Sequence, residues 1–238
     1  MIRRDYLKAS AGECGILLSG LMEEQFDRYA GLLVEWNQKM NLTAITEPDE
    51  IAVKHFVDSL APLALFSLPE GARVIDVGTG AGFPGIPWKI ARPDLELTLL
   101  DSLNKRVGFL REVLSQLGLP GEAVHARAEE GGRRPEYRER FDVATARAVA
   151  NLTVLAEYCL PYVKVGGYFA ALKSGQVEEE LAQAKGAIRL LGGKCRNVIS
   201  YTLPDGSGRS LILIEKISHL SPKFPRSSAQ MAKKPLIG

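Results

Sequence analysis

A glycine-rich loop directly after a short apolar run constrains the fold of this chain more than any other feature. Residues 74–87 read VIDVGTGAGFPGIP, so Asp76 is followed by Gly78, Gly80 and Gly82. A strand that ends in such a loop and continues into a helix is typical of doubly wound α/β sheets, in which nucleotide-like ligands bind at the carboxyl ends of the strands. Glycine allows positive φ angles there and lets the backbone approach a ligand without a Cβ clash.

An acidic residue follows the loop at the spacing of a ribose contact. Asp101 closes the next apolar run, LTLLDS, and lies about 20 residues after Gly80, where a carboxylate accepts hydrogen bonds from ribose hydroxyls. The glycine loop alone is equally compatible with an ordinary tight turn. Strand, loop, helix, strand and acid together predict a nucleoside ligand.

The loop leaves two classes of nucleoside ligand open. Residues 80–85, GAGFPG, satisfy the dinucleotide pattern G-x-G-x-x-G, so a nicotinamide-dependent dehydrogenase is one alternative. However, Pro84 and Pro87 remove amide donors that a pyrophosphate would use at the helix start. The acid before Gly78 and the antiparallel hairpin predicted below suit S-adenosylmethionine-dependent methyltransferases, whose cofactor carries no phosphate.

Beyond the loop, short apolar runs alternate with segments of helical periodicity. The runs lie at 73–77, 95–100, 123–126, 141–145 and 168–172, and the helical segments at 105–117, 152–162 and 177–191. This alternation predicts βαβ units and a parallel sheet. The final runs, 197–203 and 210–217, flank the turn sequence PDGSGR and predict an antiparallel hairpin. We therefore expect an α/β fold with a mostly parallel sheet of seven strands.

The first 70 residues have a different pattern. An apolar stripe of helical spacing follows Ser19, an N-cap candidate, and a second helix is predicted to start at Thr46-x-x-Asp49. His55 and Asp58 lie on this second helix, where we favour a hydrogen bond on the helix surface or between domains over a catalytic dyad. We predict a helical subdomain at 1–70, the α/β domain at 71–217 and a basic tail at 218–238.

Composition and charge narrow the protein class. The three cysteines, Cys14, Cys159 and Cys195, are far apart and read as free thiols in a reducing compartment. No apolar run is long enough for a membrane span and the three histidines form no convincing metal set, so we expect a cytoplasmic protein without a metal. The net charge is +2, yet residues 216–238 hold five basic and no acidic side chains. This segment is either a disordered end or a phosphate-binding tail.

Several longer motifs give the chain a family resemblance. They are WNQKMNLTAI, KHFVDSL, VIDVGTGAGFPGIP, DSLNKRVGFL, HARAEE, FDVATARA, VKVGGYFAALK and the closing FPR…KKPL. With these motifs the chain resembles the bacterial 16S ribosomal RNA guanine-N7 methyltransferases, a family called RsmG or GidB, over nearly its whole length. The resemblance implies a Rossmann-like class I S-adenosylmethionine-dependent methyltransferase fold with a small N-terminal helical extension.

The resemblance also implies site residues and partners. The cofactor contacts would fall, together with the loop residue Gly80, on Gly78, Phe83, Asp101, Ser102, Leu103, Ala128, Glu129 and Arg147. For Arg147 we expect a carboxylate partner or the target base, with a structural ion pair as the alternative. In the tail, Arg226, Lys233 and Lys234 are the predicted RNA contacts, because an acid-free segment has little to pair with internally.

The implied reaction is methyl transfer to N7 of a guanine in small-subunit ribosomal RNA, by an enzyme that we expect to be a monomer. Guanine N7 is an unprotonated acceptor on the major-groove edge, so no general base is expected and we name no catalytic residue. The RNA partner would be free 16S rRNA, an assembly intermediate or the small subunit. The alternatives are a methyltransferase with a different RNA or small-molecule substrate, a nicotinamide-dependent oxidoreductase and a non-catalytic RNA-binding module.

Overall fold

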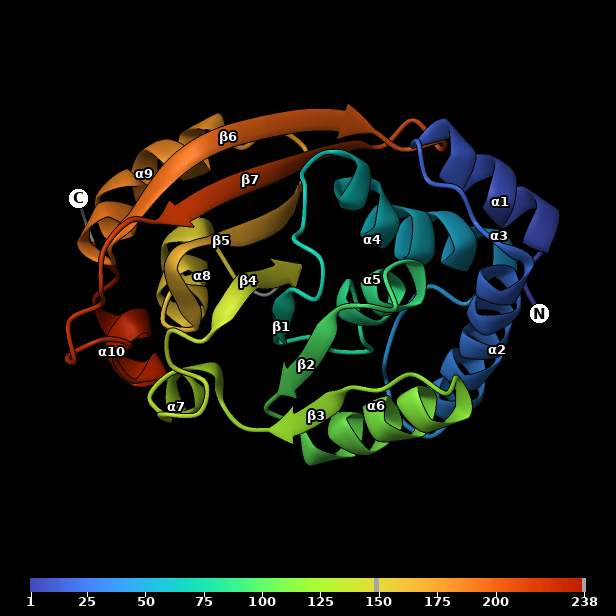
Figure 1. The fold of residues 1–238 in the computed structure, drawn as a ribbon, viewed down its shortest axis with the longest axis horizontal. Coiled ribbons are helices and arrows are strands. Elements are labelled where there is room, and N and C mark those ends of the chain that lie inside the picture. Colours follow the sequence, from blue (N-terminus) through green and yellow to red (C-terminus); the bar gives the residue numbers. More distant parts are fainter. Residues whose placement is uncertain (148–149, 237–238) are drawn as a thin grey trace.

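The framework of the protein is one seven-stranded sheet, which the computed structural model shows within the residues that it describes, 1–147 and 150–236 (Figure 1). Its strand order is β3-β2-β1-β4-β5-β7-β6. The strands are β1 Arg73–Val77, β2 Glu96–Asp101, β3 Glu122–His125, β4 Phe141–Arg147, β5 Val163–Ser174, β6 Gly193–Thr202 and β7 Gly208–Lys216. Strands β1 to β5 are parallel, whereas β7 runs antiparallel to both β5 and β6. The predicted fold class and the terminal hairpin are confirmed.

Two hydrophobic cores lie on opposite faces of the sheet. Because side chains alternate along a strand, Val74 of β1 belongs to one core while Ile75 and Val77 belong to the other. Helices α5 (Gly85–Ala91) and α6 (Asn104–Gln116) contribute to the first core, and α8 (Leu152–Cys159) and α9 (Glu178–Leu190) to the second. Coverage of both faces explains why the parallel strands read as nearly continuous apolar runs.

The N-terminal helices pack into the first core. Helix α2 (Gly20–Asn37) begins as predicted, since the Ser19 hydroxyl accepts a hydrogen bond from the Met22 amide at 3.3 Å. Helix α1 (Arg4–Glu13) was not predicted, and its buried residues are only Leu7, Ser10 and Ala11, which is too few for a clear apolar stripe.

The second predicted helix is interrupted rather than regular. It consists of α3 (Pro48–Glu50), the π-helical segment η1 (Ile51–Val57), α4 (Asp58–Leu60) and the 3₁₀ segment η2 (Ala61–Ala64). The predicted cap at Thr46 is wrong, because Glu47 is the N-cap and its side chain makes no capping bond. A π-helical turn inside a helix frequently marks a functional site.

The C-terminal tail is folded onto the sheet domain. It passes α7 (Ala128–Gly131) and ends in α10 (Ser228–Lys233), whose cap is formed reciprocally by Ser227 and Gln230. The Arg226 guanidinium binds Glu157 of α8 at 2.6 Å. The expectation that the tail cations have little to pair with internally is therefore wrong for Arg226. Lys216, which we counted with the tail charge, lies buried in β7 and pairs with Glu139.

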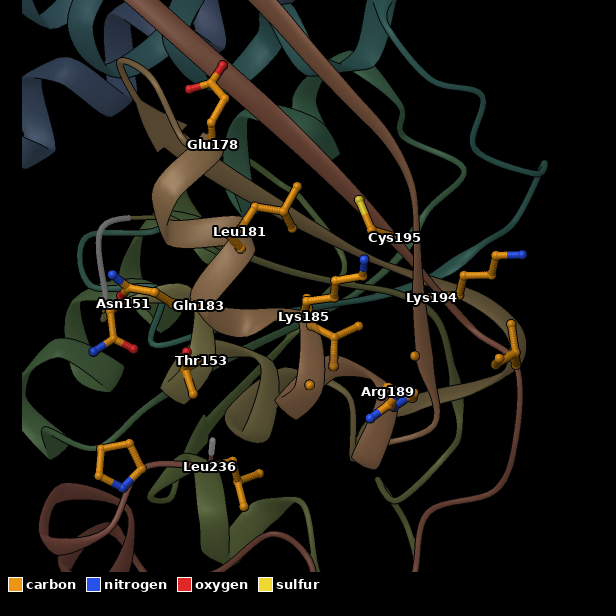
Figure 2. A pocket seen from close by; sticks show the side chains of 16 residues that line it. Asn151, Thr153, Glu178, Leu181, Gln183, Lys185, Arg189, Lys194, Cys195 and Leu236 are labelled. Atoms are coloured by element: carbon orange, nitrogen blue, oxygen red, sulfur yellow. The ribbon is translucent and has the colours of Figure 1, made fainter. Parts of the chain in front are cut away.

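An open groove lies beside this tail, between α9 and β6 (Figure 2). Asn151 and Thr153 at the start of α8 line one end of the groove, and Pro235 and Leu236 of the tail also line it. In the described part of the chain, no helix is both long enough and apolar enough to cross a membrane.

Candidate functional site

The register of the sheet gathers the predicted site residues at one edge. Val77 of β1 pairs with Leu100 of β2, Asp101 of β2 pairs with His125 of β3, and Asp76 pairs with Thr145 of β4. The loops that follow these four strands therefore leave the sheet side by side, at its carboxyl edge. Gly78 and Gly80 adopt φ angles of +70° and +63°, as the sequence predicts for this loop.

Asp76 connects the glycine loop to the start of α5. Its Oδ2 atom accepts hydrogen bonds from the Thr79 hydroxyl at 2.6 Å and from the Gly85 amide at 2.8 Å, so one carboxylate oxygen ties the start of the loop to the start of α5. Gly85 must be glycine here, because a Cβ would lie 2.6 Å from Leu99 Cδ2 and 2.9 Å from Asp76 Oδ2.

The other carboxylate oxygen of Asp76 is buried without a hydrogen-bond partner among the described residues. Burial raises the pKa of Asp76 to about 6, although the bonds from Thr79 and Gly85 oppose the shift. An unsatisfied buried acceptor is costly and calls for an explanation. A ligand with hydrogen-bond donors at this position would satisfy it.

Asp101, at the end of β2, also binds the glycine loop. Its Oδ2 atom accepts from the Gly80 amide at 3.0 Å and its Oδ1 atom from the Leu103 amide at 2.8 Å, with Arg106 Nη1 3.7 Å away. The predicted ribose acceptor is therefore already oriented by the backbone. A carboxylate offers about four acceptor positions, so two bonds leave room for a ligand hydroxyl.

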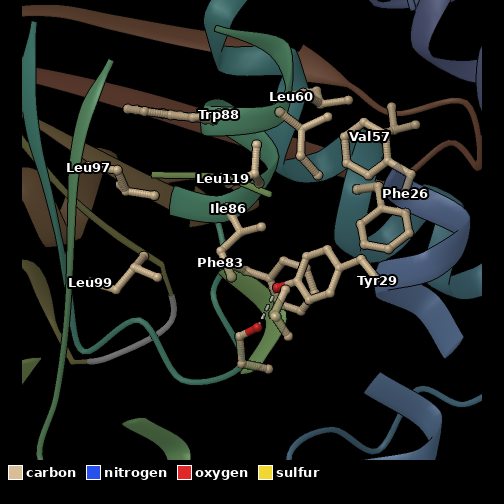
Figure 3. Close-up of a cluster of buried hydrophobic side chains, with 14 of the residues drawn as sticks. Phe26, Tyr29, Val57, Leu60, Phe83, Ile86, Trp88, Leu97, Leu99 and Leu119 are labelled. Atoms are coloured by element: carbon tan, nitrogen blue, oxygen red, sulfur yellow. Dashed lines mark hydrogen bonds between the residues drawn. The ribbon is translucent and has the colours of Figure 1, made fainter. Parts of the chain in front are cut away.

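Helix α2 of the N-terminal region packs against the glycine loop (Figure 3). The Tyr29 hydroxyl donates a hydrogen bond to the Ala81 carbonyl, inside a cluster of buried side chains that includes Phe26 and Ile86. At Gly82, where φ is +99°, a Cβ would lie 2.6 Å from the Tyr29 hydroxyl oxygen. The N-terminal helices thus form one wall of the loop rather than a separate appendage.

Phe83 is a packing residue in this structure. It is 5% exposed, stacks on Tyr29 with ring centroids 5.4 Å apart, and stacks on His55 at 4.6 Å and 13°. The Arg147 guanidinium carbon lies 4.9 Å from the centre of the Phe83 ring. The side chain that the resemblance assigns to the cofactor therefore connects the loop to η1 and to the end of β4.

Arg147 makes the structural ion pair that we considered as its alternative role. Its Nη1 atom donates to Asp58 Oδ2 at 3.1 Å, and Arg209 of β7 donates to the other carboxylate oxygen of Asp58 at 2.8 Å. Both arginines are mostly buried, with side chains 15% and 18% exposed. Asp58 thus holds together the N-terminal helices, the end of β4 and the start of β7.

His55 is neutral in this cluster. Burial and the charge of Arg147 lower its pKa to about 3. Arginine can only donate, so the contact of Arg147 Nη2 with His55 Nδ1 at 3.5 Å assigns the proton to Nε2, which donates to the Thr43 hydroxyl at 2.8 Å. His55 and Asp58 each bind Arg147 of the sheet domain, which matches the interdomain interpretation.

The remaining predicted cofactor residues line the neighbouring loops. Ser102 and Leu103 follow β2 and are exposed, with Leu103 51% accessible. Ala128 and Glu129 begin α7 after β3, where the Ala128 carbonyl accepts from the Tyr162 hydroxyl at 2.6 Å. Glu129 is 9% exposed and accepts from the Ser228 amide of the tail at 3.3 Å. The tail therefore contacts one of the residues that the resemblance assigns to the cofactor.

The start of α5 offers no nest for a pyrophosphate. Pro84, its N-cap, has no amide proton, the Gly85 amide binds Asp76, and the Ile86 amide binds the Gly82 carbonyl at 2.8 Å. Every donor that a dinucleotide would need there is absent or occupied. This geometry disfavours the dehydrogenase alternative. Among the described residues, no group of His, Cys, Asp and Glu side chains is arranged to hold a metal ion.

Sequence reasoning did not identify Tyr29, Arg209 or Glu157 as partners of site and tail residues. Tyr29 belongs to an ordinary helical stripe, and Glu157 and Arg209 carry no local signal that distinguishes them from solvated charges. The π-helical segment that contains His55 and ends before Asp58 also has no sequence signature that we recognise.

Comparisons with known proteins agree with this geometry. Residues 22–207 match the family model described as rRNA small subunit methyltransferase G, GidB. A protein of Brevibacillus brevis named ribosomal RNA small subunit methyltransferase G is 47% identical over 239 residues, which cover 100% of both chains. One of the same name from Desulforamulus reducens is 49% identical over 97% of both.

Solved structures share the fold at much lower sequence identity. A structure described as a SAM-dependent methyltransferase from Aquifex aeolicus superimposes with a TM-score of 0.54 at 19% identity, covering 76% of this chain and 98% of that one. The TrmN structure from Thermus thermophilus gives a TM-score of 0.52 at 22% identity, covering 68% and 48%.

Proposed function

The chain belongs to the rRNA small subunit methyltransferase G family, and we propose that the carboxyl edge of β1, β2, β3 and β4 is where it transfers a methyl group from S-adenosylmethionine to guanine N7 of small-subunit rRNA. One observation carries this location. The glycine loop is fixed between two carboxylates, Asp76 and Asp101, and one Asp76 oxygen is buried without a partner.

Each loop at this edge has a role in holding the cofactor. Asp101 accepts the ribose hydroxyls, with Ser102 and Leu103 beside it, and Gly78 and Gly80 let the backbone approach. In the described part of the chain, no atom lies within 4 Å of the position that a Gly80 Cβ would take. Ala128 and Glu129 flank the adenine. Phe83 and Arg147 lie behind the loop at the methionine end, where Asp58 holds the Arg147 guanidinium in place.

The residues present fit a phosphate-free nucleoside cofactor. Two carboxylates near the loop suit hydroxyl and ammonium donors and would repel a pyrophosphate, for which the start of α5 has no free amides. S-adenosylmethionine, when bound, supplies an electrophilic methyl group on a sulfonium.

The chain itself has little proton chemistry to perform. Guanine N7 attacks with its lone pair, the new N–C bond forms as the C–S bond breaks, and no proton moves. We therefore assign to the protein the alignment of the two reactants, which is worth up to roughly 7–11 kcal/mol. His55, neutral and buried, is not needed as a base.

We further propose that the enzyme acts in the cytoplasm as a monomer and that Lys233 and Lys234 at the end of α10 contact RNA phosphates. Both lysines are exposed. Arg226 serves this tail differently, because its charge is bound by Glu157 and it anchors α10 to α8.

Methyl transfer from labelled S-adenosylmethionine to 16S rRNA, with mapping of the modified base, tests the reaction. We expect one modified guanine, and label in protein or in small molecules alone would overturn the proposal. Calorimetric titration with S-adenosylmethionine and NAD tests the ligand, since only the first is expected to bind.

Asp101→Ala tests the site. The variant loses a charged acceptor for the ribose and the tie to the Gly80 amide, so cofactor affinity falls by about 1.5–3 kcal/mol, roughly 10- to 150-fold. Asp94→Ala is the matched control, because Asp94 precedes β2 at the opposite edge of the sheet and pairs with Arg92. Equal affinities for a folded Asp101→Ala and the control would remove the ribose role from Asp101.

A further inference from the structure

The groove between α9 and β6 has an apolar floor and a basic wall (Figure 2). We call it the α9–β6 groove and define it by Leu181, Lys185, Arg189, Lys194, Cys195 and Leu236. Leu181, Cys195 and Leu236 pack against the second hydrophobic core and form the floor. Lys185 and Arg189 come from α9 and Lys194 from β6, and all three side chains are exposed.

Among the residues that the structure describes, no acidic side chain pairs with these three cations. In the described part of the chain, the ion pairs of this region involve Lys173, Arg196 and Arg209, and none involves Lys185, Arg189 or Lys194. Lys185 and Arg189 are four residues apart on one helix, where like charges destabilise the helix by a few tenths of a kcal/mol. An external anion would remove this repulsion.

The one acidic side chain that lines the groove has a local explanation. Glu178 lies in the first turn of α9, together with two further glutamates, where negative charge is favourable beside the positive end of the helix dipole. It lies about three helical turns from Arg189, so the basic wall and the acidic end are separate.

The groove begins at the edge of the sheet where the proposed site lies. Asn151 lies at that end and caps α8, the helix that follows β4 and Arg147. Helix α9 follows β5, which is parallel to β4, so α9 also starts at the carboxyl edge and runs back along the sheet. From Glu178 to Arg189 the groove extends about 16 Å along the helix axis.

We propose that the α9–β6 groove holds the RNA strand that flanks the target guanine, with Lys185, Arg189 and Lys194 contacting its phosphates. The proposal rests on the proposed function, because the partner is the rRNA substrate. The residues found to line the groove include no aromatic side chain on which bases could stack, so the contact is to the backbone and independent of sequence.

Salt-dependent RNA binding tests the basic wall. The triple variant Lys185→Ala, Arg189→Ala, Lys194→Ala is compared with Lys8→Ala, Lys39→Ala, Lys164→Ala, which removes the same charge from exposed lysines that pair with acids. Binding of 16S rRNA is measured at several salt concentrations. We expect the log–log slope of the groove variant to flatten by up to about 2 units, at roughly 0.7 per contact, and the control to change less. Equal slopes in the two variants would overturn the proposal.

Two native cysteines provide a positional test that does not depend on charge. Cys195 on the groove floor and Cys14 beside α1 are both partly exposed, whereas Cys159 is buried. A thiol-reactive photocrosslinker is placed on Cys195 in a Cys14→Ser variant and on Cys14 in a Cys195→Ser variant. We expect irradiation to crosslink 16S rRNA to Cys195 and not to Cys14. Crosslinking at Cys14 alone, or at neither thiol, would overturn the proposal.

The two proposals fail in different ways. If wild-type protein does not transfer methyl groups to rRNA, the proposed function fails. If it does, while the groove variant keeps the wild-type salt slope, only the groove assignment fails. Cofactor affinity, measured without RNA, is expected to be the same in wild type and in both triple variants.

Discussion

The two ends of the chain carry opposite net charge, and their basic side chains are paired with acids to different extents. Residues 1–70 contain 11 acidic and 6 basic side chains, whereas residues 151–238 contain 6 acidic and 12 basic. In the first region, basic side chains find acidic partners: Arg3 with Asp49, Arg4 with Asp27, Lys8 with Glu23, Lys39 with Glu35 and Lys54 with Glu50. In the second region, Lys173, Arg196 and Arg226 also pair with acids, whereas the cations of the α9–β6 groove and of the end of α10 have no such partner among the described residues.

The difference indicates a division of labour along one polypeptide. The N-terminal helices contact the glycine loop through Tyr29, and they contact the end of β4 through the pair of Asp58 with Arg147. The C-terminal region presents its positive charge to solvent, where it attracts a polyanion over a distance of about one Debye length, roughly 8–10 Å. Under the two proposals above, the first end shapes the site and the second faces the RNA.

The largest effect is expected at the anchor of the tail. Arg226→Ala leaves the Glu157 carboxylate, which is 1% exposed, buried without its cation. Removing one partner of a buried ion pair costs about 3–5 kcal/mol, which denaturant unfolding measures directly. Arg196→Ala is the control, since its pair with Glu215 is partly solvated and worth less than about 1 kcal/mol. Equal costs would mean that the tail is not anchored there.

Substitutions at two glycines in the loop distinguish an effect on protein packing from an effect on cofactor binding. A valine Cβ at position 82 would lie 2.5 Å from Ile86 and 2.6 Å from the Tyr29 hydroxyl, whereas at position 80 it meets nothing within 4 Å. Gly82→Val should lower the unfolding free energy by more than about 3 kcal/mol, from overpacking and positive φ together. Gly80→Val should cost only the backbone strain, about 1–2 kcal/mol, and yet abolish cofactor binding.

Thermal unfolding and cofactor titration of both variants make this comparison. Normal cofactor binding by Gly80→Val would mean that the loop is only a turn. A stable Gly82→Val would mean that the N-terminal wall does not fix the loop, and the contrast between the two ends of the chain would weaken.

The His55 contact predicts a pH dependence of known sign. Its pKa is lowered from 6.5 to about 3, so between these values the unfolded chain binds one more proton than the native protein. The contribution of His55 to the unfolding free energy therefore rises with pH across this window, by about 1.4 kcal/mol per unit, and is lower at pH 4 than at pH 7 by about 3 kcal/mol. His55→Gln should remove this dependence.

Asp76 changes the unfolding free energy with pH in the opposite direction, so its contribution must be separated from that of His55. Its pKa is raised from 3.8 to about 6, so the native protein holds the extra proton and its contribution to stability falls as pH rises through that window. Urea unfolding of wild type and His55→Gln at several pH values isolates the histidine, because Asp76 is common to both. A difference that does not grow below pH 6.5 would contradict a neutral, buried His55.

The smallest effect is expected at the exposed end of the tail. Lys233→Ala with Lys234→Ala should flatten the salt dependence of rRNA binding by up to about 1.4 units and leave stability and cofactor affinity unchanged. Arg226 is kept intact so that α10 stays anchored. A slope that superimposes on that of wild type would confine the RNA contact to other surfaces and leave the groove as the main candidate.

Local signals were sufficient for much of the fold. The run at 73–77, the Ser19 cap and the turn PDGSGR each predicted an element that the structure contains. Helix α5 was expected after the glycine loop but without bounds, and Pro84 and Pro87 lie at its start, where proline is tolerated. Helix α10 has a capping-box signal, Ser227 with Gln230, that would have revealed it.

The sequence by itself determined where most strands lie, the glycine loop and the acid at position 101. Each of these features depends on residues close together in the chain or on an apolar periodicity of two or 3.6 residues. Only the tertiary structure decided which charges meet. Arg147 with Asp58, Arg226 with Glu157 and Tyr29 with Ala81 are 89, 69 and 52 residues apart. The pattern of apolar residues shows which face of a helix or strand a side chain occupies, whereas its partner depends on how the helices and strands pack. Arg226, which we expected to contact RNA, therefore anchors the tail through Glu157.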